Sequence, residues 1–502
     1  MNVAFRVDAS SLIGTGHLMR CLTLADALKS RGTVTRFLSR QMPDHFRDLI
    51  SKKGHEFSSL NSRSEVIVSK DIAHAAWLGT TQEADARDVL RSLSDQSWDW
   101  LVVDHYAIDE RWEVELRPLV GSILVIDDLA DRHHHCDVLL DQNFYLDMYE
   151  RYVGKVPSTC QLLLGPQYAL LRDEFRVLHE RARIRTGPVH RILVFFGGMD
   201  ADNYTSVAIE ALSKIGLPGL EIDVVMGSKH PFLDEIKARC FHYGFTCHVQ
   251  TERMAELMAK ADLSIGAGGT AIWERCCLGL PSITVSTANN QDKQILDAAL
   301  VGLLYVAGKK EKFNAVIERH INAIIENSCL RQFISTNSIR LVDAAGASRV
   351  AAKMISCNIE VRAVRQSDSE NLFNWRNHPI IRAVSRNSDP VSWEGHQSWF
   401  KSLLSDPHRF LVIGEINAKP VGVARFDNVN SRAEVSIYLV PDISNSGLGS
   451  ELLHSAECWL LCNHPEIKQL TANVLANNER SKRLFLGAGY QLEATSYTKR
   501  LN

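Results

Sequence analysis

Residues 5–28, with the sequence FRVDASSLIGTGHLMRCLTLADAL, decide the fold of the first half of the chain. The apolar run at 3–7 is typical of a buried strand, and apolar residues at helical spacing from Leu18 to Leu28 predict a helix. Gly14 and Gly16 therefore lie in a strand-to-helix turn, where a backbone without Cβ atoms can approach a ligand closely. His17 begins the helix and is a candidate catalytic base, although a glycine-rich turn alone is common in α/β proteins.

Composition excludes several classes of protein. A chain of 502 residues is long enough for two to four domains, and a net charge of −3 gives no basic excess for a nucleic-acid partner. Eleven scattered cysteines favour reduced thiols in the cytoplasm over a disulfide framework. We expect no signal peptide, no membrane span and no membrane partner. The adjacent histidines 133–135 lack a matching ligand cluster, so we expect a solvated loop there and no metal.

Strand and helix patterns alternate from residue 1 to about 155. Continuous apolar runs at 98–106 and 123–128 indicate a parallel sheet that is covered on both faces. Polar residues at the carboxyl ends of such strands lie at the same edge as the glycine turn and are site candidates. Capping or turn formation explains each of them equally well. These candidates are Asp104, His105, Asp127 and Asp128.

A second α/β segment, expected at 156–357, has the features of a nucleotide-binding domain. Gly197 and Gly198 follow a strand, and a later strand runs into a turn at 268–270 that can present backbone N–H groups to a diphosphate. Glu274 lies one turn into the next helix, where it can accept ribose hydroxyl groups or be an ordinary surface acid. Neither a P-loop nor a GxGxxG motif is present, so ATP hydrolysis and NAD are unsupported.

Residues 1 to about 350 resemble the UDP-sugar hydrolases of pseudaminic acid biosynthesis, which are similar to GT-B glycosyltransferases. The resemblance is carried by FRVDAS at 5–10, GTGH at 14–17, VDHY at 103–106, LRDEF at 171–175, Gly197-Gly198 and Asn290-Gln291. It implies two Rossmann-like domains, at 1–155 and 156–357, with the active site between them.

The resemblance also implies roles for individual residues. His17 and Asn290 match the catalytic positions, and water attack at the anomeric carbon is the implied reaction. The implied UDP-binding residues are Gly197, Gly198, Gly268, Gly269, Thr270 and Glu274. The implied sugar-binding residues are Gly16, Asp104, His105, Tyr106, Arg172 and Gln291.

Residues 358–502 begin a new pattern that resembles the GNAT N-acetyltransferases. The carrying residues are the turn Gly447-Leu448-Gly449 after a strand, and Asn478-Glu479-Arg480-Ser481 followed by Phe485. The resemblance implies acetyl-CoA as cosubstrate, with its pyrophosphate on backbone N–H groups at a helix start. The implied acetyl-CoA-binding residues are Leu439, Val440, Asn445, Gly447, Leu448, Gly449, Ser450, Asn478, Ser481 and Phe485.

This segment departs from the GNAT pattern at two positions. Ser444 replaces the usual Arg or Gln, and Phe485 replaces the tyrosine that often protonates the leaving thiolate, which leaves the general acid open. Glu434 is a candidate base acting through water, or else an exposed acid near a strand end. Amino-sugar acetyltransferases carry a similar WRN segment, which implies an acceptor pocket shaped by Trp375, Arg376, Asn377, His396 and Trp399. A place in the core explains Trp399 equally well.

Together the two resemblances imply a bifunctional enzyme that performs consecutive steps. The 4-amino group of UDP-4-amino-4,6-dideoxy-N-acetyl-β-L-altrosamine would be acetylated, and the resulting UDP-2,4-diacetamido-2,4,6-trideoxy-β-L-altropyranose hydrolysed. Three alternatives remain open: a hydrolysing 2-epimerase of the legionaminic or sialic acid pathway, a GT-B glycosyltransferase, and a non-catalytic sensor of sugar nucleotides. The sequence does not fix the oligomeric state.

Overall fold

The computed structural model shows two compact units, residues 1–351 and 352–502. Each is described by itself below. The structure describes residues 1–10, 13–60, 72–288, 291–308, 312–355, 359–385, 387–416, 418–429, 432–443, 448–475 and 478–492.

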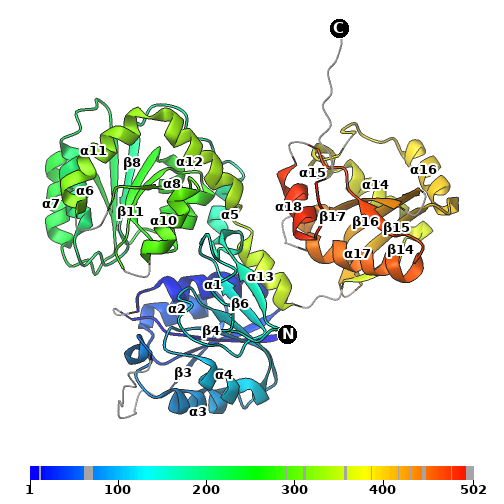
Figure 1. Cartoon of the computed structure of the whole chain (residues 1–502), viewed down its shortest axis with the longest axis horizontal. Helices are drawn as coiled ribbons and strands as arrows, with labels where there is room; N and C mark the ends of the chain where they lie inside the picture. The colour runs from blue at the N-terminus through cyan, green and yellow to red at the C-terminus, as the bar shows by residue number, and fades with distance from the viewer. Residues whose placement is uncertain are drawn as a thin grey trace, which may run out of the picture. The chain divides into compact units, whose positions relative to one another are not determined.

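The first sheet of unit 1 is fully parallel and has the strand order β3-β2-β1-β4-β5-β6-β7. Helices α3 and α4 lie along one face of it (Figure 1), where their apolar side chains join the core, and α1 is the next element after β1. The strands are β1 (Asn2–Val7), β2 (Val34–Ser39), β3 (Glu56–Ser59), β4 (Trp98–Asp104), β5 (Val120–Ile126), β6 (Val138–Asp141) and β7 (Gln161–Leu164). The helices are α1 (Gly16–Lys29), α2 (Asp44–Lys52), α3 (Gln82–Ser92) and α4 (Glu110–Leu116).

The second sheet of unit 1 is also parallel, with the order β10-β9-β8-β11-β12-β13. Apolar residues of α6, α7 and α11 cover one face, while α5, α8, α9 and α10 contribute to the core on the other. The strands are β8 (Arg191–Phe195), β9 (Glu221–Met226), β10 (Thr246–Val249), β11 (Leu263–Ala267), β12 (Ser282–Val285) and β13 (Tyr305–Val306). The helices are α5 (Asp173–His179), α6 (Tyr204–Ser213), α7 (Leu233–Tyr243), α8 (Met254–Lys260), α9 (Ala271–Cys277), α10 (Asp292–Leu300), α11 (Phe313–Glu326), α12 (Ser328–Leu341) and α13 (Gly346–Met354).

The strand-to-helix pattern expected at the start of the chain is confirmed, because β1 is followed by α1 with His17 as its second residue. The first sheet nevertheless extends further along the chain than the expected limit of residue 155. β7 pairs in register with β6, so Leu162 to Leu164 continue the first sheet. This strand is only four residues long, which explains why its apolar run is easily assigned to a connection.

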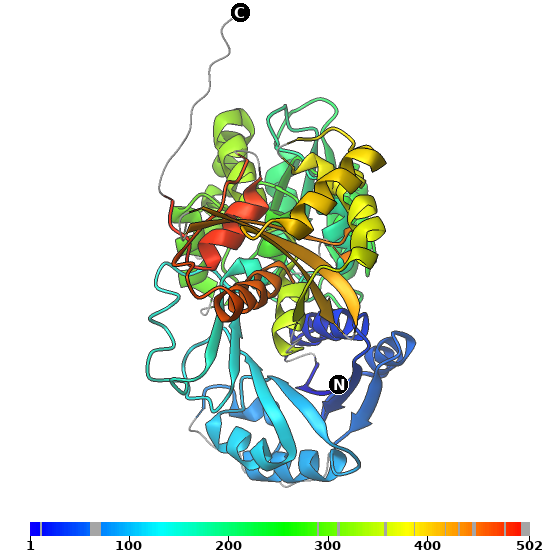
Figure 2. The same cartoon turned by 90° about the vertical axis from the view of Figure 1, so that its right-hand side faces the viewer.

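Unit 2 contains a third sheet with the order β14-β15-β16-β17-β18, antiparallel except for the last pair (Figure 2, yellow to orange). Apolar residues of α17 and α18 pack on one face, and those of α14 and α16 on the other. The strands are β14 (Glu360–Ala363), β15 (Arg409–Ile416), β16 (Lys419–Val429), β17 (Arg432–Leu439) and β18 (Gln469–Thr471). The helices are α14 (Ser369–Asn377), α15 (Pro379–Ala383), α16 (Trp393–Ser405), α17 (Gly449–Asn463) and α18 (Glu479–Gly487).

Candidate active sites

His17 and Asp104 form a hydrogen-bonded pair at the carboxyl edge of the first sheet. His17 lies at the start of α1, and Asp104 is the last residue of β4. His17 Nδ1 is 2.6 Å from Asp104 Oδ1, and the two side chains are 10% and 0% exposed. An ionised carboxylate only accepts hydrogen bonds, so Nδ1 carries the proton and Nε2 of the neutral ring keeps its lone pair. This is the arrangement of a base held by an orienting carboxylate.

Arg20 holds Asp104 from a second direction. One turn after His17 on α1, its Nε and terminal nitrogen donate to the two carboxylate oxygens at 2.6 and 2.7 Å. Burial opposes ionisation of Asp104, yet Arg20 and His17 hold its pKa well below the ordinary value. Burial also opposes the charge on Arg20, yet Asp104 and Asp128 raise its pKa well above the ordinary value. Asp104 is therefore a carboxylate at neutral pH.

Aromatic rings surround the imidazole of His17. The Tyr106 ring meets it edge to face at 4.6 Å, and Trp77 lies 6.3 Å away in a similar orientation. The Tyr106 hydroxyl donates to Asp128, whose other oxygen accepts from Arg20 at 3.1 Å. Burial raises the pKa of Tyr106 well above the ordinary value, so this hydroxyl keeps its proton. The rings and the ion pairs together fix the position of His17.

The other predicted sugar-binding residues near His17 differ in accessibility. Gly16 is exposed at the start of α1. His105 is buried: its Nδ1 accepts from the Ala107 N–H, and its Nε2 lies 3.3 Å from Asp8 Oδ2. Burial lowers the pKa of His105 although Asp8 opposes this. The structure thus places the His105 side chain in a buried network beneath the sheet edge.

Two glycine turns lie at the carboxyl edge of the second sheet. Gly197 has a φ of +94°, and a Cβ on Gly227 would stand 2.5 Å from the Gly198 carbonyl oxygen. In the second turn Gly269 has a φ of +82°, and Thr270 precedes α9 with an exposed side chain. Residues with side chains rarely adopt the positive φ angles of Gly197 and Gly269, and a side chain at Gly227 would collide with the backbone of Gly198.

Gln291 and Glu274 flank the second turn. A Cβ on Gly268 would lie 2.7 Å from Gln291 Oε1, which also accepts from the Thr287 N–H at 3.1 Å. The Glu274 side chain is 18% exposed, with Arg172 at 3.5 Å. Burial raises the pKa of Glu274, and Arg172 opposes that effect. The structure thus brings Arg172 to Glu274, and it brings the Gln291 side chain to Gly268.

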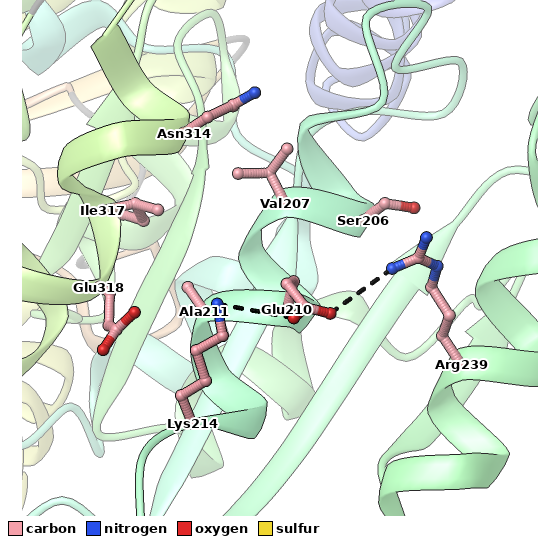
Figure 3. Close-up of a pocket in the computed structure, with 9 residues that line it drawn as sticks. All are labelled: Ser206, Val207, Glu210, Ala211, Lys214, Arg239, Asn314, Ile317 and Glu318. Carbon is pink, nitrogen blue, oxygen red and sulfur yellow. Dashed lines mark ion pairs between the residues drawn. The ribbon is translucent and has the colours of Figure 1, made fainter.

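The structure also contains a surface groove of about 290 Å³ beside the second sheet (Figure 3). Residues of α6, α7 and α11 line it, and Glu210 forms ion pairs there with Lys214 and Arg239 at 3.6 and 3.7 Å. None of the predicted site residues lines this groove. We therefore assign it no part in the chemistry.

In unit 2, the three residues of β18 pair only with the beginning of β17. Arg432 to Glu434 are in register with residues 469–471, whereas β17 continues to Leu439 in contact with β16. Glu434 is half-buried at the last paired position. Within the described residues, β18 therefore does not bond to the backbone of β17 between Glu434 and Leu439. A ligand in an extended conformation could form hydrogen bonds with a strand edge of this kind.

The predicted acetyl-CoA residues that the structure describes gather around two helix starts and the end of β17. Leu448 precedes α17, which begins at Gly449 and Ser450, and Val440 follows β17. Asn478 caps α18 by accepting from the Ser481 N–H at 3.1 Å. Phe485 is buried and meets the Tyr490 ring at 5.0 Å, while the Tyr490 hydroxyl donates to Glu457 at 2.7 Å. Asn290, Asn445 and Gly447 lie outside the described residues.

The predicted acceptor residues have mixed surroundings. Trp375 and Trp399 pack with Tyr438 of β17 on the α14 and α16 face of the third sheet. Both amide atoms of Asn377 are bonded to the backbone of Val391, at 2.8 and 2.9 Å. His396 is buried, and its Nε2 lies 3.1 Å from Ser369 Oγ. The structure places Asn377 and His396 in the protein's own hydrogen bonds, and the two tryptophans beside Tyr438.

Several residues near the sites were not singled out from the sequence. Arg20 lies three residues after His17, a helical spacing that could have identified it. Asn143 follows β6 in a polar triplet that begins with Asp141, which is the same signal that identified Asp104. His134, expected in a solvated loop, is instead buried with Nδ1 at 2.7 Å from Glu113, because this loop folds onto α4.

Two further features are absent from the described part of the chain. No group of three or more His, Cys, Asp or Glu side chains there could hold a metal ion. No helix in the same ranges is both long and apolar enough to cross a membrane.

Two family models match this chain. The model described as the glycosyltransferase family 28 C-terminal domain matches residues 191–324, and the acetyltransferase (GNAT) domain matches residues 358–491. The chain is 23% identical over 513 residues to an uncharacterized protein of Methanocaldococcus jannaschii, MJ1062, covering 98% of this chain and 97% of that one. It is 25% identical over 293 residues to the UDP-2,4-diacetamido-2,4,6-trideoxy-beta-L-altropyranose hydrolase of Campylobacter jejuni, covering 58% and 94%.

Among solved structures, MurG of Acinetobacter baumannii matches with a TM-score of 0.49 and 14% identity, covering 71% of this chain and all of that one. The chain joins a GT-B-type unit, homologous to the Campylobacter hydrolase, to a domain of the GNAT acetyltransferase family.

Proposed function

We propose that unit 1 hydrolyses UDP-2,4-diacetamido-2,4,6-trideoxy-β-L-altropyranose to UDP and the free sugar. We further propose that unit 2 makes this substrate by N-acetylating the 4-amino precursor with acetyl-CoA. The observation that carries the first proposal is the His17–Asp104 pair, at 2.6 Å, at the edge of the first sheet. The match to the Campylobacter hydrolase, which covers 94% of that protein, supports the same proposal. The GNAT match to residues 358–491 supports the second proposal.

The hydrolytic step needs a base for water and stabilisation of the leaving diphosphate. His17 Nε2 takes the proton of a water molecule as its oxygen bonds to the anomeric carbon, and the bond from that carbon to the UDP oxygen breaks. Asp104 stabilises the imidazolium that forms, because its negative charge already faces Nδ1. Attack opposite to UDP inverts the anomeric centre. Asn290 is proposed, from the resemblance alone, as the partner of His17 near the sugar.

The UDP is proposed to bind at the two glycine turns of the second sheet. Backbone N–H groups at Gly197, Gly198, Gly269 and Thr270 would face the diphosphate, and the glycines leave room for its oxygens, whereas the Gly268 N–H donates to the Val285 carbonyl oxygen at 3.1 Å. The Glu274 carboxylate would accept hydrogen bonds from the ribose hydroxyl groups. Before UDP binds, the positive charge of Arg172 balances the negative charge of this carboxylate.

The acetyl transfer is proposed to take place on the α14 and α16 face of the third sheet. Glu434, Ser436 and Tyr438 alternate along β17, so their side chains share one face, and Tyr438 packs there with Trp375. The amine nitrogen attacks the thioester carbonyl, the C–S bond breaks, and Glu434 receives the ammonium proton through water. The thiolate of CoA leaves, and the residues at the start of α17 hold its pyrophosphate.

The order of the two steps follows from the charge of the substrate. A free 4-amino group is an ammonium ion at neutral pH, and it must lose its water when it enters a sugar pocket. An acetamido group is neutral and avoids that penalty. We therefore expect little UDP release from the 4-amino substrate alone, and release after a lag once acetyl-CoA is added. Fast UDP release without acetyl-CoA would contradict this order.

The test of the hydrolase is UDP release by the full-length protein and its His17→Asn variant. Loss of at least 100-fold in turnover, with UDP affinity unchanged by calorimetry, is the expected result. Near-normal turnover of the variant would exclude His17 as the base. Proton NMR of the sugar product separates the alternatives, because a 2-epimerised sugar, or transfer to an added acceptor, would replace the proposed product.

The acetyltransferase is tested with Gly449→Val. A Cβ at Gly449 has only ordinary contacts, with Leu484 at 3.8 Å, so folding tolerates a small side chain there. The added methyl groups would obstruct the diphosphate of CoA. CoA release from the 4-amino substrate should stop while hydrolysis of the diacetamido substrate continues. A parallel loss of both activities in a folded variant would exclude independent sites.

A further inference from the structure

Asn143 lies where the two halves of unit 1 meet. It follows β6 of the first sheet, and its side chain contacts residues of both α9 and α10, which belong to the second sheet. It is 6% exposed. Its own N–H donates to Asp141 Oδ1 at 3.0 Å, which fixes the backbone from which the amide projects.

The chemistry of its neighbours sets the orientation of the Asn143 amide. The Trp273 indole nitrogen can only donate, and it lies 3.0 Å from Asn143 Oδ1. The Gln294 amide nitrogen donates to the same oxygen at 2.9 Å. The Asn143 amide nitrogen then faces Asp128 Oδ2 at 3.3 Å, a carboxylate that can only accept. A flipped amide would place donor against donor and acceptor against acceptor.

From Asn143 the contacts continue to His17 without a break. Asp128 accepts from Arg20 at 3.1 Å, and Arg20 donates to Asp104 at 2.6 Å. Asp104 accepts from His17 Nδ1. Each step in this path joins a charged group to an opposite charge or to a polar hydrogen, so a displacement of Asp128 changes the position of Arg20 and then of Asp104.

On its other side Asn143 meets the elements to which we assign UDP. Trp273 is the neighbour of Glu274 on α9. Gln294 lies one turn after Gln291, whose side chain borders Gly268. Both Trp273 and Gln294 are buried, so they move with their helices.

We propose that Asn143 is a positioning residue that couples occupancy of the UDP-binding turns to the placement of His17. The inference rests on the proposed function for the identity of the nucleotide. When UDP binds against α9 and the start of α10, these helices fix the positions of Trp273 and Gln294, which orient the Asn143 amide. Asn143 then fixes the position of Asp128. Through Arg20 and Asp104, this places Nε2 of His17 at the attacking water. Asn143 itself touches no reacting atom.

Two variants of the full-length protein test this coupling. Asn143→Ala removes all three side-chain contacts, while Asn143→Asp keeps an acceptor for Trp273 and Gln294 but loses the donor to Asp128. The second variant keeps the test open if the first fails to fold. Lys293→Ala is the matched control, because Lys293 joins α10 to Asp147 at 3.0 Å across the same contact without joining the path to His17.

The measurements are UDP affinity by calorimetry, turnover, and the ¹³C resonance of His17 in protein with labelled histidine. The His17 signal is the one missing from His17→Asn. We expect saturating UDP to shift this signal in the wild type and in Lys293→Ala. In the Asn143 variants the shift should fall by at least half and turnover at least tenfold, while the UDP dissociation constant stays within threefold.

Three outcomes are decisive. If the Asn143 variants keep the UDP-dependent shift and a turnover within twofold of wild type, the coupling role is wrong. If the shift is lost in the variants but wild type releases no UDP from the diacetamido substrate, the coupling stands and the proposed hydrolysis fails. If UDP does not bind to wild type at millimolar concentration, both proposals fail.

Discussion

Replacing Asp104 with Asn tests whether the pair with His17 supplies catalytic power. The carboxylate accepts from His17 Nδ1 and twice from Arg20, at 2.6 to 2.7 Å. The amide has one oxygen, so its NH₂ group must face either the His17 N–H or the Arg20 guanidinium. If His17 keeps the oxygen, an Arg20 contact is lost; if Arg20 keeps it, His17 must turn or change tautomer.

The expected loss can be estimated from these contacts. A hydrogen bond to a charged group contributes about 1.5–3 kcal/mol, and positioned general-base catalysis contributes about 10²–10⁴-fold in rate. We therefore expect Asp104→Asn to lose about 10²–10³-fold in turnover, equivalent to about 3–4 kcal/mol in the barrier. UDP affinity should change less than threefold, because the assigned UDP residues lie on the second sheet.

The assay follows UDP release from the diacetamido substrate with a coupled enzyme, and UDP affinity by calorimetry. Asp137→Asn is the control, since Asp137 also accepts twice from one arginine, Arg117, but at a half-exposed site before β6, at the opposite edge of the first sheet from His17. It should retain turnover within about twofold. A turnover of Asp104→Asn within threefold of wild type would refute the role of the carboxylate.

Three further predictions concern a glycine turn, a buried ion pair and the pH dependence of stability. Gly227→Ala places a Cβ 2.5 Å from the Gly198 carbonyl oxygen, so it should weaken UDP binding at least tenfold and reduce stability by about 1–3 kcal/mol; unchanged calorimetric affinity would contradict the placement of UDP. Arg6→Met leaves buried Asp8 without its arginine and Asp85 with Arg40 alone, and it should reduce the free energy of unfolding by about 3–5 kcal/mol in denaturant titrations, whereas a loss below about 1 kcal/mol would argue against the pairing. Because the pKa of Asp104 lies below that of an unfolded Asp, about 3.9, its stabilisation is present above that pH and is lost as pH falls through the folded value. The stability difference between wild type and Asp104→Asn should therefore be constant from pH 7 to 5 and shrink below about pH 4; a constant difference down to pH 3 would exclude this linkage.

The sequence predicted those features that depend on local pattern. The apolar run before the glycine turn and the helical spacing after His17 located β1 and α1, and the polar end of β4 located Asp104. Parallel strands end at a common edge, which is why both residues could be assigned to one site. The period of the pattern could not show that His17 and Asp104, 87 positions apart, are bonded directly.

The path of hydrogen bonds from Asn143 to His17 could not be predicted from the sequence, for a different reason. Asn143 and Trp273 are 130 positions apart, and neither lies in the stretches of sequence that carry the two resemblances. A polar residue after a strand has many possible partners, and capping is the commonest. Only the packing of α9 and α10 against the end of β6 selects one of them.

Buried charge beneath His17 explains why this edge of the first sheet holds its geometry. Arg6, Asp8 and Asp85 are fully buried, and Arg6 bonds to both carboxylates at 2.8 to 3.0 Å. Removing such ions from water is unfavourable, so apolar residues would stabilise the sheet at least as well. Ion pairs, unlike apolar contacts, fix direction: Asp8 faces His105, and His105 precedes Tyr106, whose ring contacts His17. We therefore infer that these ion pairs hold the His17 imidazole in position, although apolar residues would stabilise the sheet at least as well.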